Sequence, residues 1–168
     1  KNTVIVASSS AVLSAPATLL PKQSRQQILI ADDSAMNRML LAEILGTDFR
    51  ILEASNGEDC LEQLRHNPGV VALVLLDINM PVLDGFDVLS AMNRDHSIED
   101  IPVIMISSDD SKDIIRRAFE RGDSDYINRP FDARTVYRRA FNTIRLYAKQ
   151  RRLVRMVSAQ TRKQEHNT

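Results

Sequence analysis

The 168-residue sequence has one cysteine, no tryptophan and only 5% aromatic residues, and its 22 basic side chains balance its 22 acidic ones. A single cysteine excludes a disulfide scaffold and a cysteine-based zinc site. Cys60 lies among apolar positions of a helical pattern, which predicts a small buried hydrophobe rather than a reactive thiol. No apolar run approaches the ~18 residues that a membrane helix needs, so we expect a cytoplasmic protein without a membrane partner.

The zero net charge hides an asymmetry between two parts of the chain. Residues 132–168 hold ten basic and two acidic side chains, a net charge of +8, and residues 1–131 therefore carry −8. The length suits one domain with an extension, because single domains cluster near ~100–150 residues. We expect a disordered or poorly ordered N-terminal tail over 1–25, one domain over 26–148 and a helical extension over 149–168.

Five short apolar runs alternate with amphipathic helical patterns. The third run, Val71–Asp77, has no polar alternation, which is typical of a strand buried on both faces of a parallel sheet. Strands that alternate with helices of this length predict a doubly wound, five-stranded parallel α/β sheet. The runs are Gln27–Ala31, Phe49–Glu53, Val71–Asp77, Pro102–Ser107 and Asp125–Asn128. The helical patterns are Ser34–Leu45, Gly57–Arg65, Phe86–Asn93, Ser111–Arg121 and a last one after Asp132.

Polar groups stand at the ends of four predicted strands. These groups are Asp32-Asp33, Asp77, Ser107 and Arg129. The ligand crevice of this fold class lies at the carboxyl ends of the strands, so we expect the groups to converge. One acid pair often does no more than cap a helix, but complementary groups at four strand ends favour a site. Oxygen ligands without histidine or cysteine suit Mg²⁺, with Mn²⁺ as a substitute, and the hydroxyl and guanidinium suit a phosphoryl group.

The sequence around these groups contains four motifs. They are Asp32-Asp33, Asp77-Ile78-Asn79-Met80-Pro81 followed by Asp84-Gly85, Pro102-Val103-Ile104-Met105-Ile106-Ser107-Ser108, and Asn128-Arg129-Pro130-Phe131. Their order and spacing strongly resemble the receiver domains of response regulators, the CheY-like family of two-component signalling, over roughly residues 26–149. The resemblance implies a flavodoxin-like, doubly wound fold, in agreement with the fold class that the alternating runs predict.

The resemblance implies a role for each position of the site. Asp77 is implied to be the phosphoacceptor, which takes a phosphoryl group from a histidine kinase or phosphotransfer protein and is not otherwise an enzyme. Ser107 is implied to be the switch hydroxyl and Tyr126 the aromatic switch, which respond to the added charge. The implied Mg²⁺ ligands are Asp32, Asp33, Asp77 and the backbone carbonyl of Asn79.

Arg129 departs from the family pattern, in which lysine precedes the Pro-Phe pair. Its planar fork is wider than an ammonium group, so the exchange is not neutral at a compact site. In one interpretation Arg129 still pairs with the acidic cluster or the phosphoryl group, and the intact acids favour this. In the other, the domain is a pseudo-receiver that acts by protein contact. The bond before Pro130 is commonly cis in the family, and Ser108 replaces a usual alanine and narrows access to Asp77.

The basic C-terminal segment predicts one long helix. No proline or glycine occurs from Ala133 to Thr168, so we expect a helix capped by Asp132 that continues to about Thr161. A seam with seven-residue spacing can pair with a second chain as a coiled coil, which predicts a homodimer. That seam is Leu146, Leu153 and Gln160.

The charge of this helix has three interpretations: nucleic-acid binding, membrane binding, or a solvated linker toward an output domain. The sequence has no DNA-binding element and a thin apolar face, so we favour the linker and expect no direct nucleic-acid contact. A further hypothesis for the whole chain is an enzyme, a Mg²⁺-dependent phosphatase on a similar fold. Such enzymes place a second aspartate two residues after the nucleophile, and Asn79 at that position argues against it.

Overall fold

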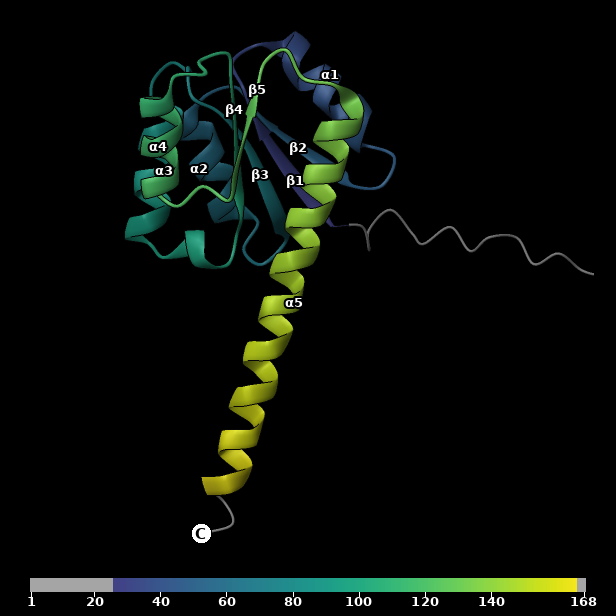
Figure 1. The fold of residues 1–168 in the computed structure, drawn as a ribbon, viewed down its shortest axis with the longest axis vertical. Helices are drawn as coiled ribbons and strands as arrows, with labels where there is room; N and C mark the ends of the chain where they lie inside the picture. The colour runs from purple at the N-terminus through teal and green to yellow at the C-terminus, as the bar shows by residue number, and fades with distance from the viewer. Residues whose placement is uncertain (1–25, 166–168) are drawn as a thin grey trace, which may run out of the picture.

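The computed structural model describes residues 26–165, so the expectation for 1–25 lies outside the described residues. Five parallel strands form one sheet in the order β2-β1-β3-β4-β5, which confirms the predicted doubly wound fold (Figure 1). The strands are β1 (Gln27–Ala31), β2 (Arg50–Ala54), β3 (Val71–Asp77), β4 (Val103–Ser107) and β5 (Asp125–Asn128). The helices are α1 (Ala35–Leu45), α2 (Gly57–His66), α3 (Gly85–Arg94), the short η2 (Ser97–Glu99), α4 (Lys112–Glu120) and α5 (Ala133–Glu165).

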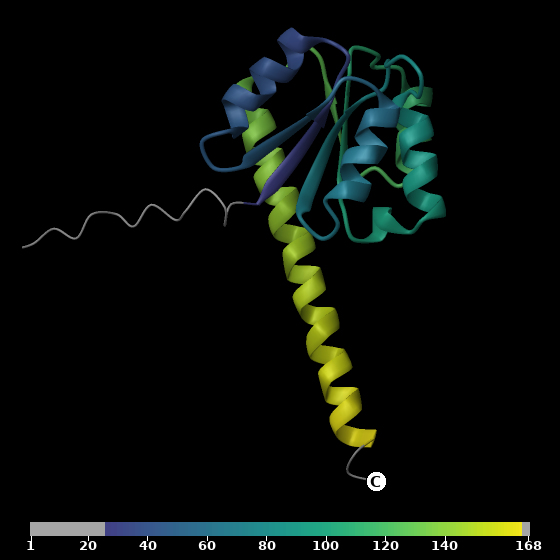
Figure 2. The ribbon, with the colours of Figure 1, turned by 180° about the vertical axis from the view of Figure 1, so that it is seen from behind.

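Helices cover both faces of the sheet (Figures 1 and 2). On one face, Cys60 of α2, Met92 of α3 and Ala118 of α4 belong to a single apolar core with the strands. On the other face, Leu41 of α1 and Val136 of α5 pack in a second core. With both faces covered, the ends of the strands are where the sheet can present polar groups to a ligand.

The central strand confirms the sequence pattern, while two other strands begin one residue later than predicted. All seven residues of β3 are buried. The N–H of Phe49 donates to the carbonyl of Leu45 at the end of α1 (3.0 Å), so this residue lies outside the β2 ladder. Pro102 has no N–H to give to a ladder and contributes only its carbonyl, which accepts from Val74 (3.0 Å).

Cys60 has the structural role that the sequence predicts. Its side chain is fully buried. Burial, with a smaller contribution from the charge of Asp59, raises the pKa of the thiol to about 12. At neutral pH the thiol is therefore protonated and unreactive.

The α5 helix begins as predicted and ends later than predicted. The Asp132 side chain accepts from the N–H groups of Arg134 (2.9 Å) and Thr135 (3.3 Å), as expected of a cap. The prediction of an end near Thr161 was wrong, because the helix reaches Glu165 with no glycine or proline to stop it. Its second half projects beyond the sheet (Figure 1). Within residues 26–165, no helix combines the length and apolar content that a bilayer crossing requires.

Candidate functional site

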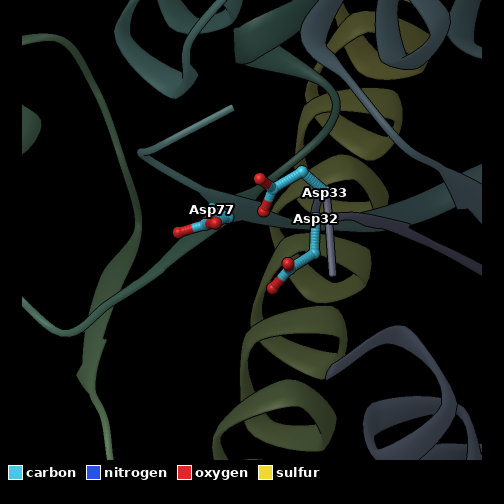
Figure 3. Close-up of side chains that lie close together, drawn as sticks. All are labelled: Asp32, Asp33 and Asp77. Carbon is cyan, nitrogen blue, oxygen red and sulfur yellow. The ribbon is translucent and has the colours of Figure 1, made fainter. Parts of the chain in front are cut away.

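Three carboxyl groups gather at the carboxyl ends of β1 and β3. Asp32 and Asp33 directly follow β1, and Asp77 is the last residue of β3, the strand that pairs with β1. One oxygen from each lies within 4.8 Å of the others (Figure 3). Asp32 and Asp77 are buried, whereas Asp33 is exposed. The parallel topology thus brings together acids that are 44 or more residues apart in sequence.

The backbone around Asp32 fixes the direction of its carboxylate. Its own N–H donates to the carbonyl of Ala54 at the end of β2 (3.1 Å). One of its side-chain oxygens, Oδ1, accepts from the N–H of Ser34 (2.8 Å). Ser34 in turn caps α1 by accepting from the N–H of Asn37 (3.3 Å). The start of α1 therefore holds Asp32 in place and leaves Oδ2 facing the site.

Arg129 lies against this acidic cluster. Its backbone N–H donates to the carbonyl of Ser107 (2.9 Å), and its peptide bond to Pro130 is cis. One guanidinium nitrogen, Nη2, hydrogen-bonds Oδ2 of Asp32, and Nη1 lies 4.0 Å from Oδ1 of Asp77. Nε of Arg129 is buried and has no hydrogen-bond partner among residues 26–165. The guanidinium of Arg129 thus contacts Asp32 and lies near Asp77, and its one positive charge balances these carboxylates only in part.

The pKa of Asp77 reports this imbalance of charge. Burial, followed by the nearby charge of Asp32, raises it to about 6. Arg129 and a hydrogen bond from the backbone N–H of Asn79 lower it, while Asp33 raises it slightly. The ionised form of Asp77 is therefore under-compensated in the protein alone, and an added cation would favour it.

Ser107 and Tyr126 are linked through Asp109. Ser107 is fully buried at the end of β4, and its hydroxyl oxygen accepts from the N–H of Asp109 (3.2 Å). The hydroxyl of Tyr126 donates to the carbonyl of Asp109 (2.7 Å). Tyr126 is half-buried against the core, and burial is the main cause that raises its pKa. The motifs did not single out Asp109, because it takes part through its backbone.

A recess of about 420 Å³ opens beside Arg129. It is lined by Asn37 and Leu40 of α1, by Ser108, and by the Arg129-Pro130-Phe131 segment. Ser108 is exposed on its rim. The sequence analysis did not predict that Asn37 and Leu40 of α1 line this wall.

The donor set fits a hard divalent cation. Within residues 26–165, Asp32, Asp33 and Asp77 form the one group of three metal-ligating side chains that converge this closely. All three offer carboxylate oxygens, which Mg²⁺ prefers, and no histidine or cysteine belongs to the group. The partial neutralisation by Arg129 leaves negative charge for such an ion to balance.

Sequence comparisons identify the family of this chain. The family model of the response regulator receiver domain matches residues 28–141. The two-component response regulator ORR5 of Oryza sativa subsp. japonica is 29% identical over 119 residues, covering 70% of this chain and 88% of that protein. The two-component response regulator ARR2 of Arabidopsis thaliana is 32% identical over 111 residues, covering 66% of this chain but only 16% of that protein.

Solved structures share the fold. A CheY-like response regulator receiver domain protein from Methanospirillum hungatei superposes with a TM-score of 0.68 at 20% identity, covering 76% of this chain and 99% of that one. A chain of the CheX-CheY-BeF3-Mg²⁺ complex from Borrelia burgdorferi gives a TM-score of 0.64 at 29% identity, covering 70% and 87%. Since the family model matches more than half of its residues and its fold is the same, this chain belongs to the response regulator receiver domain family.

Proposed function

We propose that this receiver is a phosphorylatable switch of a two-component response regulator, with Asp77 as the phosphoacceptor. The observation that carries the proposal is the convergence of Asp32, Asp33 and Asp77 beside the Arg129 guanidinium. The related Borrelia complex contains BeF3 and Mg²⁺, which supports a similar ligand chemistry here. Receiver domains interact with histidine kinases or phosphotransfer proteins, and we propose that such a partner supplies the phosphoryl group to this one.

The chemistry is a nucleophilic displacement at phosphorus. A carboxylate oxygen of Asp77 forms the new bond, while the P–N bond of the partner's phosphohistidine breaks and the imidazole leaves with the electron pair. The Arg129 guanidinium, 4.0 Å from Asp77, is placed to bind the transferred oxygens. Bound Mg²⁺, or Mn²⁺ in its place, would supply charge neutralisation at those oxygens. We assign its binding to Asp32, Asp33, Asp77 and the backbone carbonyl of Asn79.

The proposed switch runs from Ser107 to Tyr126. A phosphoryl group on Asp77 adds about −1.5 to −2 charge units and strong hydrogen-bond acceptors beside the end of β4. The Ser107 hydroxyl is a hydrogen-bond donor at the end of β4, which lies next to β3 and its last residue Asp77. A new bond from this hydroxyl would disturb its contact with the N–H of Asp109, whose carbonyl holds the Tyr126 hydroxyl. Phosphorylation would thereby change the surface formed by α4 and β5.

The decisive experiment is incubation with acetyl phosphate, followed by measurement of intact mass with Mg²⁺ and after its removal by a chelator. The proposal expects one phosphoryl adduct with Mg²⁺ or Mn²⁺ and none without a divalent ion. The alternative function, a pseudo-receiver that acts by protein contact, is favoured by Arg129 in place of lysine. It expects no adduct from any phosphodonor and no spectral response to beryllofluoride with Mg²⁺.

Arg129→Ala is expected to strengthen Mg²⁺ binding, on the order of tenfold in Kd, while it slows phosphorylation. The substitution removes a cation that repels the metal and occupies Oδ2 of Asp32, but it also removes a group that binds the phosphoryl oxygens. Arg129→Lys, which keeps the charge, is the matched control and should stay close to the wild type in Mg²⁺ affinity. Calorimetric Mg²⁺ titration measures the effect, and an unchanged or weaker affinity in Arg129→Ala would contradict it.

An apolar surface on α1 supports docking of the partner beside the site. Met36 and Met39 are 74% and 66% exposed, and Leu40 lines the recess next to Arg129. Met39→Glu is expected to lower the rate of phosphotransfer from a phosphohistidine-bearing protein about tenfold, because a charge would enter an apolar contact. Acetyl phosphate should label this variant at the wild-type rate. Val70→Glu, an exposed apolar position just before β3, serves as the control, and equal losses in both variants would argue against this surface.

The remaining parts of the proposal concern the whole protein. We propose a receiver unit over residues 26–148, a linker over 149–168 and an output domain after α5. We also propose that the protein acts in the cytoplasm as a homodimer, without direct nucleic-acid contact by this segment. The uninterrupted helix from Ala133 to Glu165 supports a rigid connection between the two units.

A further inference from the structure

The second half of α5 carries one uncharged stripe on a basic helix. Residues 145–165 hold seven basic side chains and one acidic one. At 100° per residue, all seven basic positions fall outside a sector about 200° wide. Within that sector, a narrower stripe about 80° wide consists of Leu146, Gln150, Leu153, Val157, Gln160 and Gln164. Its apolar members Leu146, Leu153 and Val157 are 54–62% exposed.

Most of the stripe points away from the receiver, whereas Gln150 at its edge lines a recess together with Glu99 and Asp100. Val136, Ala140 and Ile144 are the α5 residues buried against the sheet. Their direction differs from that of the stripe by roughly 120°, again at 100° per residue. A second helix can therefore approach the apolar members of the stripe without meeting the body of the domain.

We propose that residues 146–164 pair with the same segment of a second copy as a parallel, in-register, two-stranded coiled coil. The stripe alternates by four and three residues, which is the a/d spacing of a heptad. Leu146 and Leu153 then occupy d positions and Val157 an a position, the combination that favours two strands, and Gln150 at a is a polar residue that fixes register. This proposal specifies how the homodimer of the proposed function forms, and it does not depend on phosphorylation.

The lysines decide the orientation of the two helices. In this register Lys149 and Lys163 occupy g positions. In a parallel pair, g faces the e position five residues later, so Lys149 faces the partner's Val154 and no like charges meet. In an antiparallel pair, g faces g, and Lys149 would meet Lys163 of the other copy at both ends of the contact. Repulsion therefore disfavours the antiparallel pair.

The basic side of the helix does not require an acidic partner. Arg151 and Arg155 line a recess of about 370 Å³ together with Glu99 and Asp100 of the segment before β4. Part of the positive charge of α5 thus faces acids of its own domain. The uncharged stripe is the surface left for another molecule, and a second copy is the occupant that it matches in spacing and in charge.

Sedimentation velocity of the full chain over a dilution series tests the pairing. We expect a monomer–dimer equilibrium in the wild type and a monomer in Leu153→Arg. The matched control Ala159→Arg adds the same charge on the opposite side of the helix and should still dimerise. Far-UV circular dichroism of each variant, which does not depend on phosphorylation, establishes that its receiver is folded. A monomeric wild type, or a dimer that survives Leu153→Arg, would overturn the proposal.

Salt and a disulfide probe test the occupant and the register. Added salt should strengthen the dimer, because the outer faces of both helices are positive, whereas it would weaken docking of an acidic partner. Under mild oxidation, Gln160→Cys should form a disulfide between copies, since equal d positions meet only in a parallel, in-register pair. Ala159→Cys is the control that should not link. Failure of Gln160→Cys to link in a chain that dimerises would exclude the parallel register.

Discussion

Asp77→Asn is expected to abolish phosphorylation by acetyl phosphate, to the level of a reaction without protein. The amide has no ionised oxygen to attack phosphorus, and no other described carboxylate combines burial at the end of a strand with a guanidinium 4.0 Å away. Asp32, the nearest buried alternative, is engaged by Arg129 and by the N–H of Ser34. Intact mass spectrometry measures the adduct. Asp110→Asn changes an exposed acid and serves as the control, and an adduct on Asp77→Asn equal to that of the wild type would assign the phosphoacceptor elsewhere.

The same substitution is expected to stabilise the metal-free fold at neutral pH. The pKa of Asp77 is raised from 3.8 to about 6 in the folded protein, so ionisation of Asp77 opposes folding. Its contribution to stability is complete below pH 3.8 and is lost as the pH rises through about 6. Above that pH, the free energy of unfolding of Asp77→Asn should be about 1–2 kcal/mol higher than that of the wild type. This value is smaller than the pKa shift alone gives, because solvent at the edge of the sheet screens the charge. Urea unfolding with a chelator present, at pH values on both sides of 6, measures the gap. A gap that is absent or independent of pH would contradict the charge imbalance.

The fold followed from the sequence wherever burial alone decides the pattern. Residues 71–76 are apolar without interruption because both faces of the central strand are covered, and the structure gives the strand the predicted bounds Val71–Asp77. The predicted strand boundaries were wrong where a hydrogen bond to another element determines whether a residue belongs to the strand. Phe49 is apolar like its neighbours, yet its N–H belongs to the end of α1. The last helical residue of α5 depends on where the helix frays, because no glycine or proline ends it. The spacing of apolar residues does not predict that position.

The candidate site was predictable as a set of residues and not as a set of contacts. Parallel topology requires the ends of β1 and β3 to meet, so the convergence of Asp32 and Asp77 could be expected. The sequence could not show which of these acids Arg129 contacts, because Asp32 lies 97 residues away from it in the chain and the contact depends on the loop after β5. Val82 adopts a left-handed backbone (φ 70°) in the loop after Asp77, although a β-branched side chain disfavours it. The N–H of Leu83 donates to the carbonyl of Pro81 (2.9 Å), which closes a tight turn around this residue.

Gly85→Ala is expected to lower the free energy of unfolding by about 1–3 kcal/mol and to slow phosphorylation, because Gly85 sets the distance between α3 and the strand that carries Asp77. A Cβ at this position would lie 2.5 Å from the carbonyl oxygen of Asp77, 2.9 Å from Cα of Ile78 and 3.0 Å from Cε of Met105. Two of these atoms are backbone and cannot turn aside. The N–H of Gly85 also donates to the carbonyl of Ile78 (2.8 Å), so the helix start cannot retreat without weakening that bond.

The strain in Gly85→Ala therefore falls on the backbone of the phosphoacceptor itself, and stability and labelling rate should decrease together. Gly69→Ala separates this effect from the general cost of replacing a glycine. Gly69 has a positive φ of 72° but no atom within 4 Å of a built Cβ, so its replacement should cost about 1 kcal/mol through backbone conformation alone. It lies in the turn before β3, at the end of the sheet opposite Asp77, and should leave the rate of labelling by acetyl phosphate unchanged. Urea unfolding and labelling kinetics of both variants measure the difference. Wild-type labelling in Gly85→Ala would mean that the Asp77 loop tolerates displacement and that α3 does not position the site.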